Sequence, residues 1–176
     1  KFYQENYNGH GVLLNSFESY DLNEGLATSD YSPVNYEEKI RYVEEILSKH
    51  KYEYEYDPEP KLQEILNLLP KAYQRFNNKR EEIKFNSDTN VYIYLPENKL
   101  CKVSCNGFGY EVIDASDFDD KKYVTYKLDY KLLHRILKGP RFAHWNNAEI
   151  GSHIMFSRKP EIYERALYFS MNYFHC

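Results

Sequence analysis

Hydrophobic positions follow two periods along this chain. Between residues 35 and 85 they recur three or four positions apart, as in Ile40, Val43 and Leu47, which is the spacing of one helical face. From Asn90 onward polar and apolar residues come close to alternating, as in NVYIYL, which is typical of strands. The pattern therefore predicts a helical subregion followed by a strand-rich region.

The helical subregion is predicted to hold several short helices. Asn35 has the chemistry of an N-cap, and the helix that it starts is expected to run to about His50. A second helix is expected to begin near residues 58–60. Pro70 should break or kink it, and residues 71–82 should form a further helix. Their apolar stripes are narrow, so we expect these helices to pack on another part of the chain.

The strand-rich region predicts a sheet with later helices. Four strands are expected in NVYIYL, KLCKVSC, GYEVID and YVTYKLD. A helix capped by Asp129 and stopped by Gly139, a strand at residues 154–156 and a final helix over residues 160–175 should follow. The predicted fold is α+β: an antiparallel sheet of about five strands with helices packed on one face, preceded by a helical pair.

The first residues carry a different pattern. The segment Gly11–Phe17, GVLLNSF, suits a strand but has no predicted neighbour nearby, and turn-forming residues fill 19–34. We therefore expect residues 1–34 to be the severed end of an upstream domain plus a linker. The remaining domains are predicted as a helical subregion over 35–85 and an α+β domain over 86–176.

Composition and charge exclude some function classes. The formal charge of -4, with both signs interspersed, argues against a nucleic-acid partner. No apolar run reaches the length of a membrane span and no signal layout opens the sequence, so we expect a cytoplasmic location. Cys101, Cys105 and Cys176 make an odd count without CxxC spacing, and the first two, on one face of a strand, are expected to be small core residues rather than a disulfide or zinc site. The 19 Tyr and 10 Phe suggest either a cavity or interface, or ordinary packing.

The candidate chemistry is concentrated in Gly139–Arg158, GPRFAHWNNAEIGSHIMFSR. This segment holds the only Trp and an unusual density of polar side chains for a segment that must be partly buried. Three hypotheses stay open. The first is a metal site on His144, Glu149 and His153. The second is a polar recognition patch for a sugar nucleotide or for the mouth of a neighbouring active site, and the third is a buried polar network that holds the fold. The candidate substrate-binding residues are Arg141, His144, Trp145, Asn146, Asn147, Glu149 and His153.

Two motifs carry a family resemblance. The order LLHRILKG, then residues 151–156, then residues 160–175 is similar to the sterol-carrier-protein-like fold. The run GPRFAHWNNAEIGSH followed by RKPEIYERALYF resembles the C-terminal region of metallo-β-lactamase-fold proteins in the branch of the sugar-nucleotide hydroxylases, which includes CMP-sialic-acid hydroxylase. This resemblance covers roughly residues 123–175, and VLLNSFESYD, at residues 12–21, loosely resembles the last strands of that family's metal-binding domain.

The resemblance implies a function for the whole protein rather than a catalyst in this chain. The HxHxDH motif that carries the family's metal does not occur in the sequence. The resemblance therefore implies an accessory C-terminal domain that helps substrate positioning or assembly, with no catalytic residue and no cofactor of its own. The divalent metal, zinc or iron, is expected in an upstream metal-binding domain.

The alternative is a free-standing binding module that encloses an apolar or sugar-nucleotide ligand. Whether the parent enzyme is a hydrolase or a hydroxylase stays open, as does self-association into a homo-oligomer.

Overall fold

The computed structural model describes residues 14–27, 32–119 and 121–176, and the chain divides into two compact units, Lys1–His50 and Lys51–Cys176. Each unit is described by itself. The boundary falls inside the predicted helical subregion, because the helices after residue 60 belong to the same unit as the sheet.

The described residues of the first unit form a small hairpin, an α-helix and a short 3₁₀-helix, Leu47–Lys49. Strands β1 (Tyr20–Asp21) and β2 (Leu26–Ala27) pair antiparallel within the segment predicted as a linker. Helix α2 (Tyr36–Glu45) begins where it was predicted, since the Asn35 side chain accepts a hydrogen bond of 3.0 Å from the backbone N–H of Glu37. The predicted strand over 11–17 lies outside the described residues up to residue 13, and residues 14–17 form no strand.

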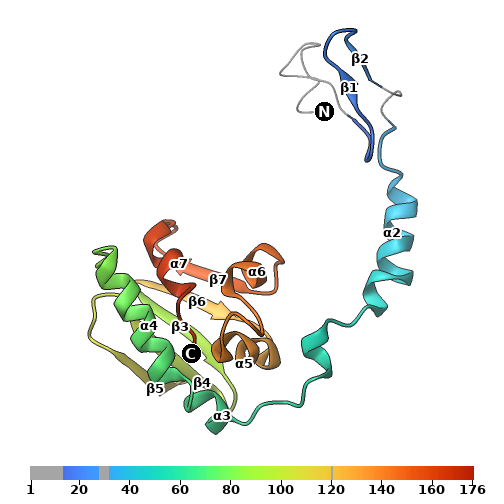
Figure 1. The fold of residues 1–176 in the computed structure, drawn as a ribbon. Coiled ribbons are helices and arrows are strands. Elements are labelled where there is room, and N and C mark those ends of the chain that lie inside the picture. The colour runs from blue at the N-terminus through green and yellow to red at the C-terminus, as the bar shows by residue number, and fades with distance from the viewer. Residues whose placement is uncertain (1–13, 28–31, 120) are drawn as a thin grey trace. The chain divides into compact units, whose positions relative to one another are not determined.

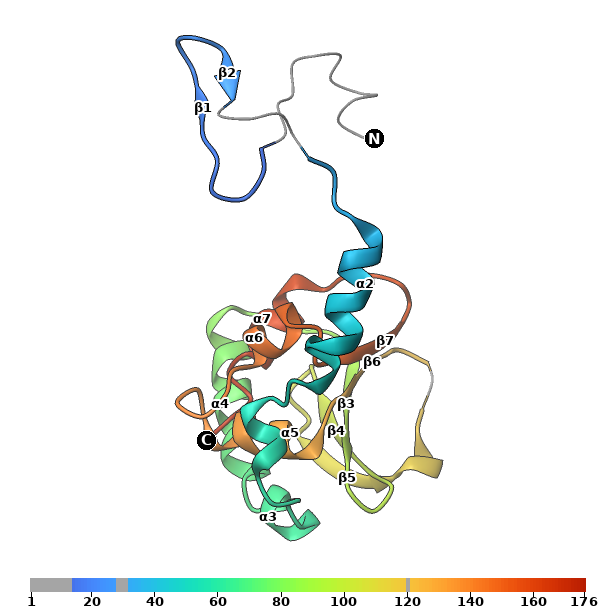
Figure 2. The ribbon, with the colours of Figure 1, turned by 90° about the vertical axis from the view of Figure 1, so that its right-hand side faces the viewer.

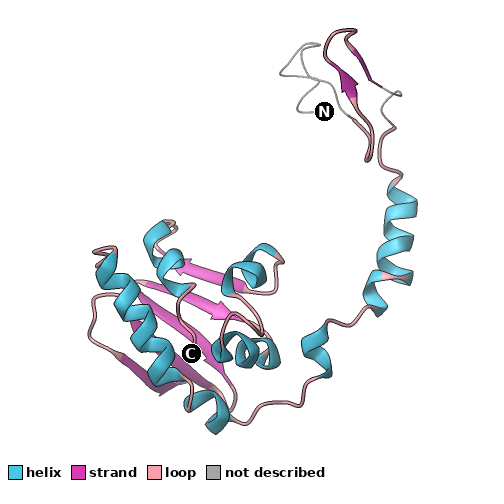
Figure 3. Cartoon of the chain, viewed as in Figure 1, coloured by secondary structure: helices cyan, strands magenta, loops and turns pink. Residues whose placement is uncertain are grey.

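The second unit is built on a five-stranded sheet with the order β5-β4-β3-β6-β7 (Figures 1 and 3). Its strands are β3 (Asn90–Leu95), β4 (Lys99–Ser104), β5 (Tyr110–Asp114), β6 (Tyr123–Lys127) and β7 (Met155–Lys159). The α+β class and the five-stranded sheet are confirmed. The sheet is mixed rather than purely antiparallel, because β6 lies parallel to β3.

The parallel pair follows from the path between β5 and β6. Strand β5 lies at one edge, and the chain returns across the sheet to place β6 on the other side of β3. Phe118, in this connection, packs edge-on against Tyr92 of β3 and Tyr123 of β6, with ring centroids 4.7 and 4.9 Å apart. The connection therefore covers part of the sheet face that carries Tyr92, as burial of an aromatic ring favours.

The helices of the second unit cover the opposite face, as Figures 1 and 2 show from two directions. They are α3 (Leu62–Leu66), α4 (Leu69–Glu82), α5 (Tyr130–Lys138), α6 (Trp145–Ile150) and α7 (Arg165–Met171). Alternate sheet residues, such as Val91, Ile93 and Tyr126, share one hydrophobic cluster with Phe76 of α4 and Leu133 of α5. The prediction of helices on one face is thus confirmed.

Several predicted element boundaries differ from the structure. Pro70 does not interrupt a helix but lies in the first turn of α4, where its missing N–H costs nothing. Helix α7 begins at Arg165 rather than at Pro160. The residue before it, Glu164, accepts hydrogen bonds from Ser87 and Thr89 at 2.7 and 2.5 Å, which ties the start of α7 to the start of β3.

The end of the chain also leaves the predicted helix. After α7 the chain turns, so that Phe174 enters the core and the backbone N–H of Cys176 donates to the carbonyl of Leu137 at 2.8 Å. Helix α6, which the sequence pattern did not predict, lies inside the polar segment.

None of the helices formed by the described residues has the length and apolar character needed to cross a bilayer.

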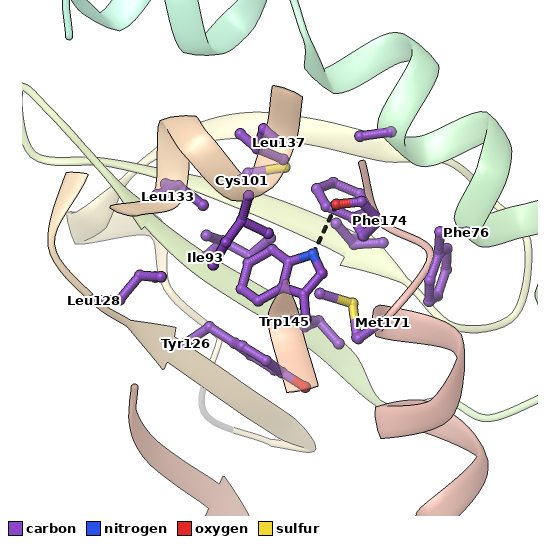
Figure 4. Packing of buried hydrophobic residues seen from close by; sticks show 14 of the residues in the cluster. Phe76, Ile93, Cys101, Tyr126, Leu128, Leu133, Leu137, Trp145, Met171 and Phe174 are labelled. Carbon is purple, nitrogen blue, oxygen red and sulfur yellow. Dashed lines mark hydrogen bonds between the residues drawn. The ribbon is translucent and has the colours of Figure 1, made fainter. Parts of the chain in front are cut away.

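The Trp145 indole is the central side chain of this core (Figure 4). It is 2% exposed, packs edge-on against Tyr126 and donates its Nε1–H to the carbonyl of Phe174 at 2.8 Å. Replacing it removes both a large buried ring and the partner of a buried carbonyl.

We expect Trp145→Ala to lower the free energy of unfolding of the chain by about 3–5 kcal/mol, as for other large-to-small core changes. Trp145→Phe should cost less, about 1–3 kcal/mol, because it keeps a ring but leaves the Phe174 carbonyl without its donor. Urea denaturation followed by circular dichroism measures both. A loss below 1 kcal/mol for the alanine variant would contradict this role.

Candidate functional site

Helix α6 divides the predicted site residues between two sides. Its N-cap is His144, whose Nδ1 accepts a hydrogen bond of 3.2 Å from the backbone N–H of Asn146. Trp145 and Ala148 are buried and fix the rotation of the helix against the core. As a result His144 and Asn147 lie on one side of α6, and Asn146 and Glu149 lie on the other.

The first side borders a hollow of about 280 Å³, which we call the Tyr–His hollow. It is formed by the segment before α3, by α5 and by the segment around α6. Its lining residues are Tyr52, Glu53, Tyr54, Leu132, Arg135, Phe142, Ala143, His144, Asn147, Ala148 and His153. Aromatic faces, imidazoles and an amide therefore share one open space.

Three aromatic side chains form one wall of the hollow. Tyr52 and Tyr54 stack with their centroids 5.7 Å apart, and the His153 ring stands edge-on to Tyr52 at 4.6 Å. The Tyr54 hydroxyl lies 3.3 Å from Nδ1 of His153. Burial raises the pKa of Tyr54, with smaller contributions from Asp129 and Glu55, so the phenol stays protonated and able to donate.

The position of His153 depends on Gly151. A Cβ atom at residue 151 would lie 2.8 Å from the His153 ring and 3.0 Å from the carbonyl oxygen of Asn147. These distances are shorter than a van der Waals contact, so any larger residue at position 151 would have to displace the His153 ring and shift the backbone at Asn147.

Arg135 of α5 fixes the tyrosine wall. Its Nε and Nη2 donate to the two carboxylate oxygens of Asp57 at 2.5 and 2.8 Å, and its Nη1 lies 3.4 Å from Glu53. The hydrogen bond from Arg135 lowers the pKa of Asp57, so the pair stays ionised. The guanidinium thus holds the segment of Tyr52 and Tyr54 against α5 and is already paired.

The other side of α6 faces a second depression. It is lined by Asn146, Glu149, Ile150, Tyr163, Arg165, Tyr168, Phe169 and Asn172. Burial raises the pKa of Glu149, and the charge of Arg158 offsets this in part. Glu149 is therefore a partly desolvated carboxylate whose ionised form the fold penalises.

The structure brings together only some of the predicted residues. His144, Asn147 and His153 share the Tyr–His hollow, Asn146 and Glu149 lie in the second depression, and Trp145 fills the core. Arg141 is exposed and lines neither space. Within the described ranges no group of three or more His, Cys, Asp or Glu side chains is placed to hold a metal ion.

Sequence reasoning missed most of the residues that line the hollow. Tyr52, Tyr54 and Arg135 come from segments that were assigned no chemistry, whereas Phe142 lies in the polar segment but was not named as a candidate. The run YEYEY, residues 52–56, was the available signal, because so dense an alternation of Tyr and Glu is uncommon in a plain linker.

No family model, curated protein or solved structure matches the chain. The family resemblance therefore stays a prediction that rests on the residues of the polar segment.

The raised pKa of Glu149 predicts a pH-dependent effect of Glu149→Gln. At low pH the Glu149 carboxyl is protonated in both the folded and the unfolded chain, so its burial does not reduce the free energy of unfolding. As the pH rises through the folded-state pKa, the wild-type chain loses stability because the buried carboxyl must ionise. The glutamine variant has no carboxyl to ionise, so its stability does not fall in this way. We expect it to be more stable than the wild type at pH 7 and equally stable below about pH 3, where an unfolded Glu is almost fully protonated.

Thermal melts across this pH range measure the difference, with the exposed Glu161→Gln as control. A glutamine variant less stable at pH 7 would mean that attraction to Arg158 outweighs the cost of burial.

Proposed function

We propose that residues 51–176 form an accessory ligand-binding domain and that the Tyr–His hollow is its binding site. The ligand that fits best is a small polar molecule with an aromatic or sugar ring, and the sequence resemblance points to a sugar nucleotide. On this proposal the domain positions the ligand for a metal-dependent reaction carried out by another domain.

The observation that carries the proposal is the composition of the hollow. Phe142 and Tyr52 offer ring faces, Asn147 offers a donor and an acceptor, and the imidazoles of His144 and His153 add further hydrogen-bonding atoms. A few polar groups that converge on an apolar surface are typical of small-molecule sites.

A cation for a phosphate lies at the edge of the same hollow. Arg135 is paired with Asp57, but the ammonium of Lys138 lies 4.5 Å from the centroid of the Phe142 ring. Lys138 has no ion pair among the described residues. A ring stacked on Phe142 could thus place its phosphate beside this charge.

The filled core favours this surface hollow over an enclosed apolar tunnel. Ile93, Tyr126, Trp145, Met171 and Phe174 occupy the space between the sheet and the helices (Figure 4). A tunnel between these layers would have to displace side chains that already pack together.

The binding site is tested by Asn147→Ala, with Asn146→Ala as the matched control on the opposite side of α6. Titration of the chain with UDP-N-acetylglucosamine and with CMP, followed by calorimetry and by amide chemical shifts, should give a saturable response at Asn147 and His153. We expect Asn147→Ala to weaken binding about tenfold, the equivalent of one hydrogen bond of roughly 1.4 kcal/mol. Asn146→Ala should leave the affinity unchanged.

Equal losses in both variants would contradict the proposed geometry, as would the absence of any response at His153. The melting temperature of each variant separates a binding defect from a folding defect. The accessory role has its own test: the coding sequence upstream of Lys1 should carry an HxHxDH motif.

A further inference from the structure

The turn between β4 and β5 presents an aromatic side chain to solvent. Phe108 is 90% exposed, although turn tips usually carry polar residues. Gly107 and Gly109 flank it with φ of +90° and +112°, which side chains other than glycine rarely adopt. The turn therefore has a backbone conformation that requires glycines, and it carries a Phe108 ring that contributes nothing to the core.

The turn is braced by α4 rather than loose. Arg80 of α4 donates to the carbonyl of Phe85 and to Oδ1 of Asn77, each at 3.0 Å. A Cβ at residue 107 would lie 2.6 Å from Nη2 of Arg80, so the guanidinium packs directly against the turn. The backbone N–H of Phe108 also donates to Oδ1 of Asn106 at 3.2 Å. The backbone that carries the ring is thus held in place before any ligand arrives, which lowers the entropic cost of binding.

A polar depression of about 400 Å³ lies beside this ring. It is formed by the start of β3 and by the facing ends of β4 and β5. Its lining residues are Asp88, Asn90, Lys102, Ser104, Asn106, Phe108, Gly109, Tyr110 and Glu111. The depression is separate from the Tyr–His hollow, with which it shares no residue.

Several polar groups of the depression are not used by the fold. Lys102 and Glu111 pair at 2.6 Å and so satisfy each other. Three side-chain groups have no hydrogen-bond partner among the described residues. They are the carboxylate of Asp88, the side-chain amide of Asn90 and the side-chain nitrogen Nδ2 of Asn106. Acceptors and donors are therefore both available next to an exposed ring.

This combination selects a class of ligand. The polar lining does not suit an apolar molecule, and two carboxylates against one lysine do not favour an anion. A pyranose has an apolar face that can stack on an aromatic ring, and hydroxyl groups that need both donors and acceptors. We propose that the depression binds a neutral saccharide, stacked on Phe108 and hydrogen-bonded to Asp88, Asn90 and Asn106.

The test is a titration of the ¹⁵N-labelled chain with glucose and with N-acetylglucosamine. At least one of these sugars should shift the amides of Asn106, Phe108 and Gly109 in a saturable way. Phe108→Ala should weaken this binding at least tenfold, whereas Phe108→Trp should retain it. Phe169→Ala, which removes another exposed ring, is the control and should bind as the wild type does.

Asp88→Asn provides a second variant that keeps the ring and changes one acceptor. It should also weaken sugar binding, and Asn146→Ala, at a residue that lines neither proposed site, should not. The proposal is overturned if neither sugar shifts these amides, or if the shifts survive in Phe108→Ala. Two other outcomes would also overturn the proposal, because they assign the ring to a different ligand. One is binding of choline chloride in place of sugar. The other is recruitment to phosphatidylcholine–phosphatidylglycerol vesicles that depends on Phe108.

Discussion

The hydrogen bond from the Trp145 indole to the Phe174 carbonyl is the constraint on which the site geometry depends. A buried N–H must find an acceptor, and this one lies in the turn after α7, 29 residues along the chain. Helix α6 has only six residues and is too short to be stable alone. The burial of Trp145 therefore sets the rotation of α6 about its axis. With this rotation Asn147 faces the Tyr–His hollow, whereas Asn146 and Glu149 face away from it.

The opposite wall of the hollow depends on a different device, an ion pair between distant segments. Arg135 holds Asp57 across 78 residues of sequence, and Tyr54 reaches His153 across 99. Both contacts lie outside the hydrophobic core. Directional polar bonds, rather than apolar packing, therefore hold this wall in place. Such walls separate at a lower free energy than the core unfolds, so a ligand that contacted both walls would stabilise their present arrangement by mass action.

Most of the scaffold could be predicted from the sequence because its signals are local. Asn35 and Asp129 cap helices by accepting bonds from the N–H groups two residues on, and the strands β3 to β6 follow period-two patterns. The failures had non-local causes. The parallel pairing of β6 arises from the crossover after β5, and α7 starts late, next to Glu164, whose carboxylate accepts hydrogen bonds from Ser87 and Thr89 just before β3. Likewise, the sequence pattern predicted the candidate residues as one set, but the burial of Trp145 places them on different sides of α6.

The filled core also limits where this domain can bind anything. Burial of Tyr126, Trp145 and Phe174 between the layers leaves ligand sites at the surface, where their walls must come from loops and short helices. The Tyr–His hollow meets this condition with residues that directly follow the unit boundary at His50. A ligand there would contact Tyr52 and Tyr54 and so tighten the first segment of the sheet-containing unit onto α5.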